Sequence, residues 1–393
     1  MALAPKQCLV ATSFLNGDYS RVLPIISSFF TVKDFQRNVR EDYVQFLIAD
    51  VEIKDKFPAF LKQLGKVGMV ASAKRSKYVS RLMPTLSTVR LSVDDGVVLT
   101  IAKIQKQKPR SKFWQSLPSL LFIATIALVF VDGILRSGSP LARTQVQDPL
   151  LLAVIYTMSL MGILGIHELG HILANRKYGI KASWPYFIPG VPTLLPTFGA
   201  LIVLRGNMTN RNVMFDVGIA GPIAGLIVTI FVSVYGSTLS TLITPEEAQR
   251  LFGENQLFTL PFGESLLMIA TLHLTGMAVN NMVLVYSPVL YAAWFGFLIT
   301  FLNLMPAWQL DGGHLARSAL GARWHKVLTY VSIGILFAIG FYPMALLVLF
   351  FSIKAPESTP LDDVTPLSPK RKALFFVALG LAVVTAPIPA TLF

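Results

Sequence analysis

The chain has 393 residues, of which 53% are apolar and only 14% are charged. Soluble globular proteins carry about 25% charged residues, so this composition argues against a soluble protein. The formal net charge of +13 is unevenly shared: residues 1–112 hold 19 Lys and Arg against 9 Asp and Glu, whereas the other 281 residues hold 15 against 12. We predict a basic soluble domain over residues 1–112 and a membrane-embedded domain over residues 113–393.

The first domain has the pattern of a small α/β unit. Its apolar residues predict a helix over about residues 54–64 and strands near residues 44–49, 67–73, 88–93 and 97–104. Asp94, Asp95 and Gly96 predict a hairpin turn between the last two strands. The basic run over residues 103–112 is a signal for the cytoplasmic side, and it could also draw the domain onto the anionic surface of a lipid bilayer.

Six apolar segments in the second domain have the length of a membrane-spanning helix, about 17 to 25 residues. They cover residues 117–135, 150–174, 217–239, 288–304, 327–351 and 373–392. The fifth contains Pro343 and could be two half-helices that form a hairpin. We therefore expect an α-helical polytopic membrane protein with about six transmembrane helices, divided into a core over residues 113–320 and C-terminal helices over residues 321–393.

Basic residues near the ends of the spans indicate their orientation, because Lys and Arg favour the cytoplasmic side. Basic residues follow the second and fourth spans, and these are Arg176, Lys177, Lys181, Arg317, Arg323 and Lys326. With the basic run before the first span, they place the N-terminal domain and the ends of the second and fourth spans on the cytoplasmic side.

The second span contains the motif His167-Glu168-Leu169-Gly170-His171. Ionisable side chains inside a membrane cost several kcal/mol, so each one is a functional hypothesis. Histidines four residues apart share one face of a helix, where they can bind one metal ion, and Glu168 beside them can accept a proton from water. The single cysteine excludes a metal site built from several cysteines.

Two histidines do not complete a catalytic zinc site, which usually has three protein ligands. The best third candidate is Asp311, which follows the fourth span on the same predicted side as His171. A full membrane crossing by residues 266–286 would carry Asp311 to the opposite side. We therefore predict that residues 266–286 form a re-entrant or interfacial segment.

These motifs resemble those of the site-2 protease family of intramembrane zinc metalloproteases, in its archaeal and plant-chloroplast-like branch. The resemblance covers residues 113–320 and rests on the His-Glu-x-x-His helix and on Asn303, Pro306 and the Leu310-Asp311-Gly312 run. It implies that His167, His171 and Asp311 hold Zn²⁺, and that Glu168 activates water to cleave a peptide bond in a single-span membrane-protein substrate.

One position departs from the family pattern. Many relatives have Gly-Pro-x-x-Asn in the third span, whereas this chain has Gly221-Pro222-Ile223-Ala224-Gly225. Asn303 is then the better candidate for a catalytic side chain that assists substrate or oxyanion binding. The glycines in this span have the spacing of a close helix contact, and the pattern alone assigns them only that structural role.

The segment between the second and third spans predicts a place for the substrate. Four prolines among residues 184–204 argue against a spanning helix, and residues 198–204 predict a strand. A substrate must be extended before it is cut, so we expect it to add to the edge of this strand near the active site.

A metal-ion carrier or sensor that uses the same His/His/Asp site is the alternative function. A carrier gains little from Glu168, so Glu168→Gln should spare transport but abolish proteolysis. We expect an integral membrane protein of a prokaryotic cell membrane, with its active site toward the cytoplasm and no nucleic-acid partner.

Overall fold

The computed structural model describes residues 17–38, 40–75, 96–104, 111–138, 148–193, 195–204, 206–253, 262–354 and 358–388. The chain divides into two compact units. The first combines residues 1–109, 207–214 and 359–368, and the second combines residues 110–206, 215–358 and 369–393. Each is described separately below.

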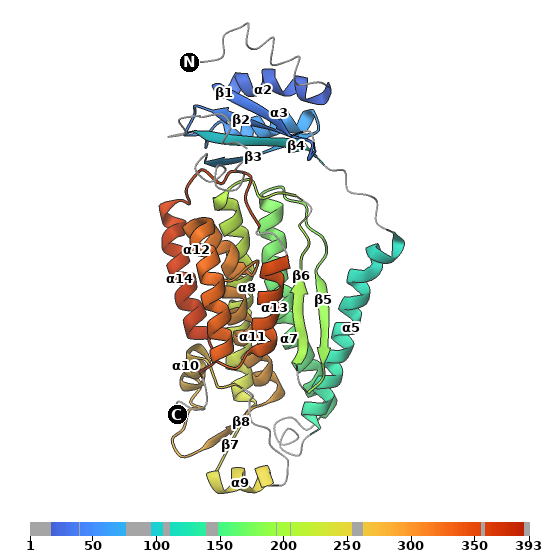
Figure 1. The fold of residues 1–393 in the computed structure, drawn as a ribbon. Helices are drawn as coiled ribbons and strands as arrows, with labels where there is room; N and C mark the ends of the chain where they lie inside the picture. Colours follow the sequence, from blue (N-terminus) through green and yellow to red (C-terminus); the bar gives the residue numbers. More distant parts are fainter. Residues whose placement is uncertain are drawn as a thin grey trace. The chain divides into compact units, whose positions relative to one another are not determined.

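The first unit is a four-stranded antiparallel sheet with two helices on one face (Figure 1). The strands lie in the order β1 (Val32–Asn38), β2 (Tyr43–Ile48), β4 (Val97–Lys103) and β3 (Met69–Arg75). A short 3-10 helix (Gly17–Arg21) precedes α2 (Val22–Phe29), and α3 (Phe57–Lys66) follows β2. Alternate residues of β3 and β4 are buried, and they form one hydrophobic core with the apolar sides of the helices.

Two segments that lie far along the sequence extend this sheet beyond β3. The backbone of Ala73 in β3 pairs in parallel with Asp362, which in turn pairs with Asn210. Val364 is part of the hydrophobic core of the unit, and Leu361 packs against that core. The unit is therefore assembled from three parts of the chain, and the edge of β3 is covered by segments that come from between the later helices.

Four of the five helices and strands predicted for residues 44–104 are present in the residues that the structure describes. The predicted strands near residues 44–49, 67–73 and 97–104 are β2, β3 and β4, and the predicted helix is α3. The prediction missed α2 and β1. The predicted strand over residues 88–93 and most of the turn at Asp94 and Asp95 lie outside the described residues.

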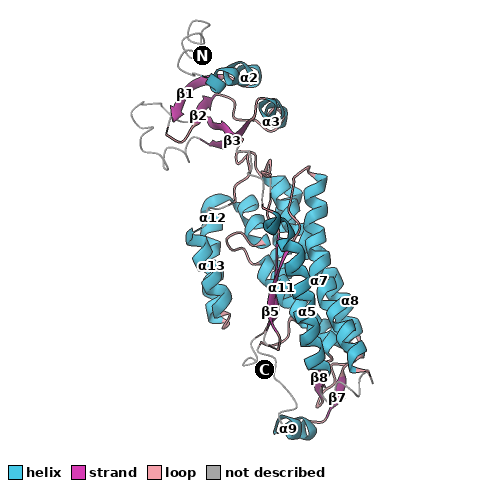
Figure 2. Cartoon of the chain, turned by 90° about the vertical axis from the view of Figure 1, so that its right-hand side faces the viewer, coloured by secondary structure: helices cyan, strands magenta, loops and turns pink. Residues whose placement is uncertain are grey.

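The second unit is a bundle of helices (Figures 1 and 2). Within its described residues, three helices are long and apolar enough to cross a membrane. They are α5 (Lys112–Ser137), α7 (Pro149–Lys177) and α8 (Arg211–Thr238). The first turn of α7 is capped by Asp148, whose side chain accepts hydrogen bonds from the backbone N–H groups of Leu150 and Leu151, and Pro149 occupies the first turn. The first, second and third expected spans are therefore present as helices.

A shorter helix lies at the centre of this unit. α11 (Pro288–Leu304) has 17 residues, and nearly all of its side chains are buried against the surrounding helices. Ser287 caps its first turn by accepting a hydrogen bond from the N–H group of Leu290, and Pro288 follows the cap. Its bounds are those of the fourth expected span.

The remaining helices depart from six simple spans. α12 (Asp311–Ala338) is kinked at Gly321 and ends before Gly340, whose φ of 85° belongs to the left-handed region. α13 (Tyr342–Lys354) and α14 (Pro369–Thr385) follow. The fifth expected span is thus two helices. The helical backbone is interrupted at Gly340, and Pro343 lies in the first turn of α13, where its missing N–H group is tolerated. A count of six spans is not confirmed, since three helices in the described residues meet the length and hydropathy of a span.

Two small sheets complete the unit. β5 (Tyr186–Val191) and β6 (Leu195–Leu201) form an antiparallel hairpin that lies along the helices, with β5 in contact with α5 and β6 in contact with α7 (Figure 1). The predicted strand over residues 198–204 therefore exists but begins three residues earlier. β7 (Thr241–Ile243) pairs with β8 (Val283–Val285), and α9 (Pro245–Gly253) follows β7.

The segment over residues 266–286 does not cross a membrane as one helix. α10 (Leu266–Leu274) has nine residues, and β8 follows it after a turn. A helix of that length spans only about 14 Å, less than half of a bilayer core. The structure thus agrees with the expectation that this segment is not a complete helical crossing.

Candidate metal centre

The two histidines of the motif lie one helical turn apart on α7 and are both buried. Their imidazoles converge, with 3.2 Å between His167 Nε2 and His171 Nε2. Nδ1 of His171 lies 2.8 Å from the backbone carbonyl of Val217 in α8. When Nδ1 carries the proton and donates to this carbonyl, Nε2 keeps its lone pair for a metal ion.

Asp311 reaches the histidines because the chain turns sharply after α11. Met305 ends the helix in an extended conformation, Trp308 has a φ of 42°, and α12 begins at Asp311. Gly312 allows this return, since a Cβ atom there would lie 2.1 Å from the carbonyl oxygen of Leu304. The carboxylate is thus placed by the first residue of a helix that packs against the end of the preceding one.

The three side chains have the spacing of a tetrahedral zinc site. Oδ2 of Asp311 lies 3.3 Å from His167 Nε2 and 3.3 Å from His171 Nε2. Ligand atoms that are 2.0–2.1 Å from a tetrahedral zinc ion are about 3.3–3.4 Å from one another. All three distances, including the 3.2 Å between the imidazoles, agree with that geometry. The donor set therefore fits zinc.

Helix α8 supplies the wall behind the histidines. A Cβ atom on Gly221 would lie 2.1 Å from Nε2 of His171, and one on Gly225 would lie 3.1 Å from Nδ1 of His167. A Cβ atom on Gly218 would lie 3.3 Å from the carbonyl oxygen of Asp311. The role predicted for these glycines was close helix packing alone, and the structure shows that Gly221 and Gly225 pack against the imidazoles of the candidate metal ligands.

Two further polar side chains border this cluster. Glu168 is buried, and it interacts electrostatically with His167, His171 and Asp311. Asn303, in the last turn of α11, places its side-chain amide 3.4 Å from His167 Nε2. The structure therefore brings all five sequence-predicted site residues together from the three helices α7, α11 and α12.

The sequence reasoning missed the residues that hold the Asp311 loop. His325 and Thr329 of α12 lie one turn apart and are buried, and both contact the backbone of Trp308. Nε2 of His325 lies 2.9 Å from the Trp308 carbonyl, and the Trp308 N–H group donates to the Thr329 hydroxyl at 3.0 Å. Their spacing of four residues, which places both side chains on one face of the helix, was the available signal.

Two acidic residues outside the metal centre, Asp216 and Asp132, were also not predicted to make specific contacts. Asp216 makes a two-oxygen ion pair with Arg371 of α14 at 2.7 Å and accepts a hydrogen bond from Tyr178. Asp132 in α5 was given no role, although it is fully buried within a candidate membrane span.

Comparison with known proteins agrees with this centre. Residues 155–347, which include both histidines, Asn303 and Asp311, match the description peptidase family M50. The matched region covers 193 of the 393 residues of the chain. The prediction of a site-2 protease relative is thereby confirmed.

Several proteins of similar sequence come from plants. One, from Arabidopsis thaliana, is named probable zinc metalloprotease EGY1, chloroplastic, and is 34% identical over 57% of this chain and 41% of its own length. Another, from Oryza sativa subsp. indica, is named probable zinc metalloprotease EGY2, chloroplastic, and is 27% identical over 74% of this chain and 52% of its own length. The chain spans about half the length of these relatives, and their chloroplast names do not support the expected prokaryotic membrane.

Proposed function

We propose that the protein is an intramembrane zinc metalloprotease that cleaves single-span membrane proteins. The observation that carries the proposal is the convergence of His167, His171 and Asp311 beside the buried Glu168, with two of the ligands on a helix long enough to cross a membrane. The names of the plant relatives support the same chemistry.

In this proposal the ligands are His167, His171 and Asp311. A zinc ion held by them would lower the pKa of water and polarise the carbonyl of the scissile bond. Glu168 accepts the proton of the attacking water and then gives it to the leaving amine. Asn303 points its amide at the same place and is suited to donate a hydrogen bond to the oxygen that gains negative charge.

The β5–β6 hairpin supports a binding mode in which the substrate is an added strand. Asp132 contacts both Tyr156 in α7 and Thr193 in the hairpin turn. Tyr156 and Thr193 therefore lie at about the same height along the axis of α7. His167 is eleven residues from Tyr156, a rise of about 16 Å, and a strand covers that distance in about five residues. Five residues from Thr193 along β5 is Ile188, so we place the site beside the part of the hairpin between the pair Phe187 and Ala200 and the pair Pro189 and Thr197.

We propose that the substrate pairs with β6 at this level, because extended backbone inside a membrane needs hydrogen-bond partners. Ala200→Pro should then abolish cleavage while zinc remains bound. Unchanged turnover by Ala200→Pro would contradict the pairing of substrate with β6, but it would not contradict the proposed zinc ligands.

The finer topology is also part of the proposal. About six crossings, with α11 and α14 among them, would place the ends of α7 and α11 on the cytoplasmic side, together with the domain over residues 1–112. The active site would then be reached by water from the cytoplasm over a short path.

The test compares the wild type with Glu168→Gln in proteoliposomes that contain a tagged single-span model protein. Proteolysis by the variant should fall by several orders of magnitude, while its zinc content should equal that of the wild type. A metal carrier predicts the opposite result, because Glu168→Gln would leave zinc transport into the vesicles largely intact and the wild type would not cut the model protein.

A further inference from the structure

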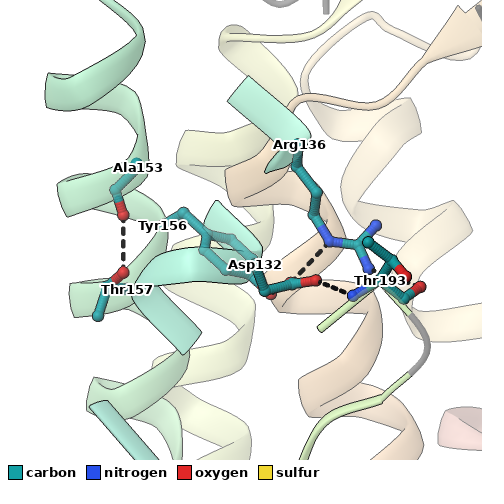
Figure 3. Close-up of polar contacts among 6 residues, drawn as sticks. All are labelled: Asp132, Arg136, Ala153, Tyr156, Thr157 and Thr193. Atoms are coloured by element: carbon teal, nitrogen blue, oxygen red, sulfur yellow. Dashed lines mark hydrogen bonds and ion pairs between the residues drawn. The ribbon is translucent and has the colours of Figure 1, made fainter. Parts of the chain in front are cut away.

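A buried ion pair lies in the second unit, apart from the metal centre. The Asp132 side chain in α5 is fully buried, and Nε of Arg136, one turn further along the same helix, donates to its Oδ2 at 2.7 Å (Figure 3). Charged residues within a membrane span are costly, and a chain that keeps one has a use for it. None of the proposed steps of proteolysis involves this pair.

The pair connects three helices. The hydroxyl of Tyr156 in α7 donates to Asp132 Oδ2 at 2.5 Å. The Arg136 guanidinium lies over the ring of Tyr291 in α11, 3.7 Å from its centroid. Gly133 allows the close approach of α5 to α7, since a Cβ atom there would lie 2.8 Å from a ring carbon of Tyr156. The framework around the ion pair is thus tightly packed.

The same two side chains hold the turn of the β5–β6 hairpin. The backbone N–H group of Thr193 donates to Asp132 Oδ1 at 2.6 Å, and Nη2 of Arg136 donates to the Thr193 carbonyl at 3.3 Å (Figure 3). Thr193 has a φ of 68°, which is unusual for a residue with a side chain. Both contacts are to backbone atoms, so they fix the position of the turn whatever its side chain is.

We propose that Asp132 and Arg136 are positioning residues that set the register of substrate cleavage; the proposal rests on the proposed protease function and on the added substrate strand. A strand that slips by one residue turns every side chain to the opposite face. The clamp, defined as Asp132, Arg136 and the Thr193 backbone, prevents β6 from sliding along α7. It thereby determines which backbone groups of β6 are level with Glu168, and so which substrate bond is presented there.

The test is Asp132→Asn in the full-length protein, with a single-span model protein as substrate and mass spectrometry of the products. Displacement of the reacting atoms by about 1 Å costs about 100-fold in rate, so kcat should fall by about that factor. The cut should spread from one bond to neighbouring bonds, while zinc content remains that of the wild type. A purely stabilising role would not move the cleaved bond.

Thr157→Val is the matched control. Thr157 follows Tyr156 on α7 and is buried, but its hydroxyl donates to the Ala153 carbonyl of its own helix and not to the hairpin (Figure 3). This variant should cut the wild-type bond at the wild-type rate. An Asp132→Asn protein that does the same overturns the proposal, and so does one that raises KM with kcat unchanged.

If Asp132→Asn does not fold, Arg136→Lys tests whether the clamp determines the cleaved bond. Lysine keeps the positive charge beside Asp132 but lacks the second nitrogen that reaches the Thr193 carbonyl. The products of this variant should again include cuts at neighbouring bonds, and a single wild-type cut overturns the proposal. A wild-type protein that cuts nothing would instead contradict the protease function itself, so the two failures are distinguishable.

Discussion

The backbone of Gly221 lies directly against the imidazole of His171, with no room for a side chain between them. Gly221→Ala should displace His171 and lower zinc affinity by about 10–100-fold, the usual cost of disturbing the orientation of a metal ligand. Zinc content after dialysis against graded zinc buffers measures this. Gly162→Ala in α7 is the control, because a Cβ atom there meets nothing within 4 Å, and its zinc affinity should not change.

Zinc should stabilise the folded protein through Asp311. A ligand present at 100 times its Kd contributes about 2.7 kcal/mol to stability. We expect zinc to raise the Tm of the chelator-treated wild type in detergent, and to have no such effect on Asp311→Asn. A comparable rise in this variant would show that the carboxylate is not a ligand.

The Trp308 carbonyl should be a determinant of metal affinity, although it touches no ligand. His325→Phe removes its buried hydrogen-bond partner, at a cost of about 1–3 kcal/mol. The loop before Asp311 should loosen, so both Tm and zinc affinity should fall. Ser352→Ala in α13 removes a hydroxyl bonded within its own helix and should lower neither. Equal zinc affinity in the two variants would limit His325 to a role in stability.

Removal of the N-terminal domain should destabilise the rest of the chain. A chain that begins at residue 111 loses the core that buries Val364 and the strand that pairs with Asp362. We expect the truncated protein to aggregate, and a double change of Leu361→Ser and Val364→Ser to restore its solubility. Size-exclusion chromatography in detergent compares the two proteins. A truncated chain that is monodisperse without these changes would contradict the expectation.

The metal centre could be foreseen because zinc requires particular side chains at particular distances. The spacing of four residues between His167 and His171 predicts that they share one face of a helix. The predicted side of the membrane on which each span ends then limits the third ligand to residues such as Asp311. The glycines of α8 carry no such requirement in the sequence. Their role became visible only when Gly221 was found against His171.

The clamp and the extended sheet could not be foreseen for a different reason. Asp132 meets a backbone N–H group sixty-one residues away, and a backbone group leaves no mark in the sequence. Residues 207–214 and 359–368 likewise contribute edge pairing to the first unit without an alternating apolar pattern of their own. Hydropathy found α5, α7 and α8 because they are long and apolar, whereas the division between α12 and α13 was indicated only by Pro343.

The shortness and full enclosure of α11 have a consequence for the chemistry. Its 17 residues rise about 25 Å, less than the thickness of a bilayer core, and its side chains face protein on nearly every side. Lipids therefore neither solvate this helix nor set its length. We expect the packing of the protein, and not the thickness of the bilayer, to determine which substrate bond is cleaved. Vesicles made from lipids with shorter or longer acyl chains should then change the rate of cleavage but yield the same product.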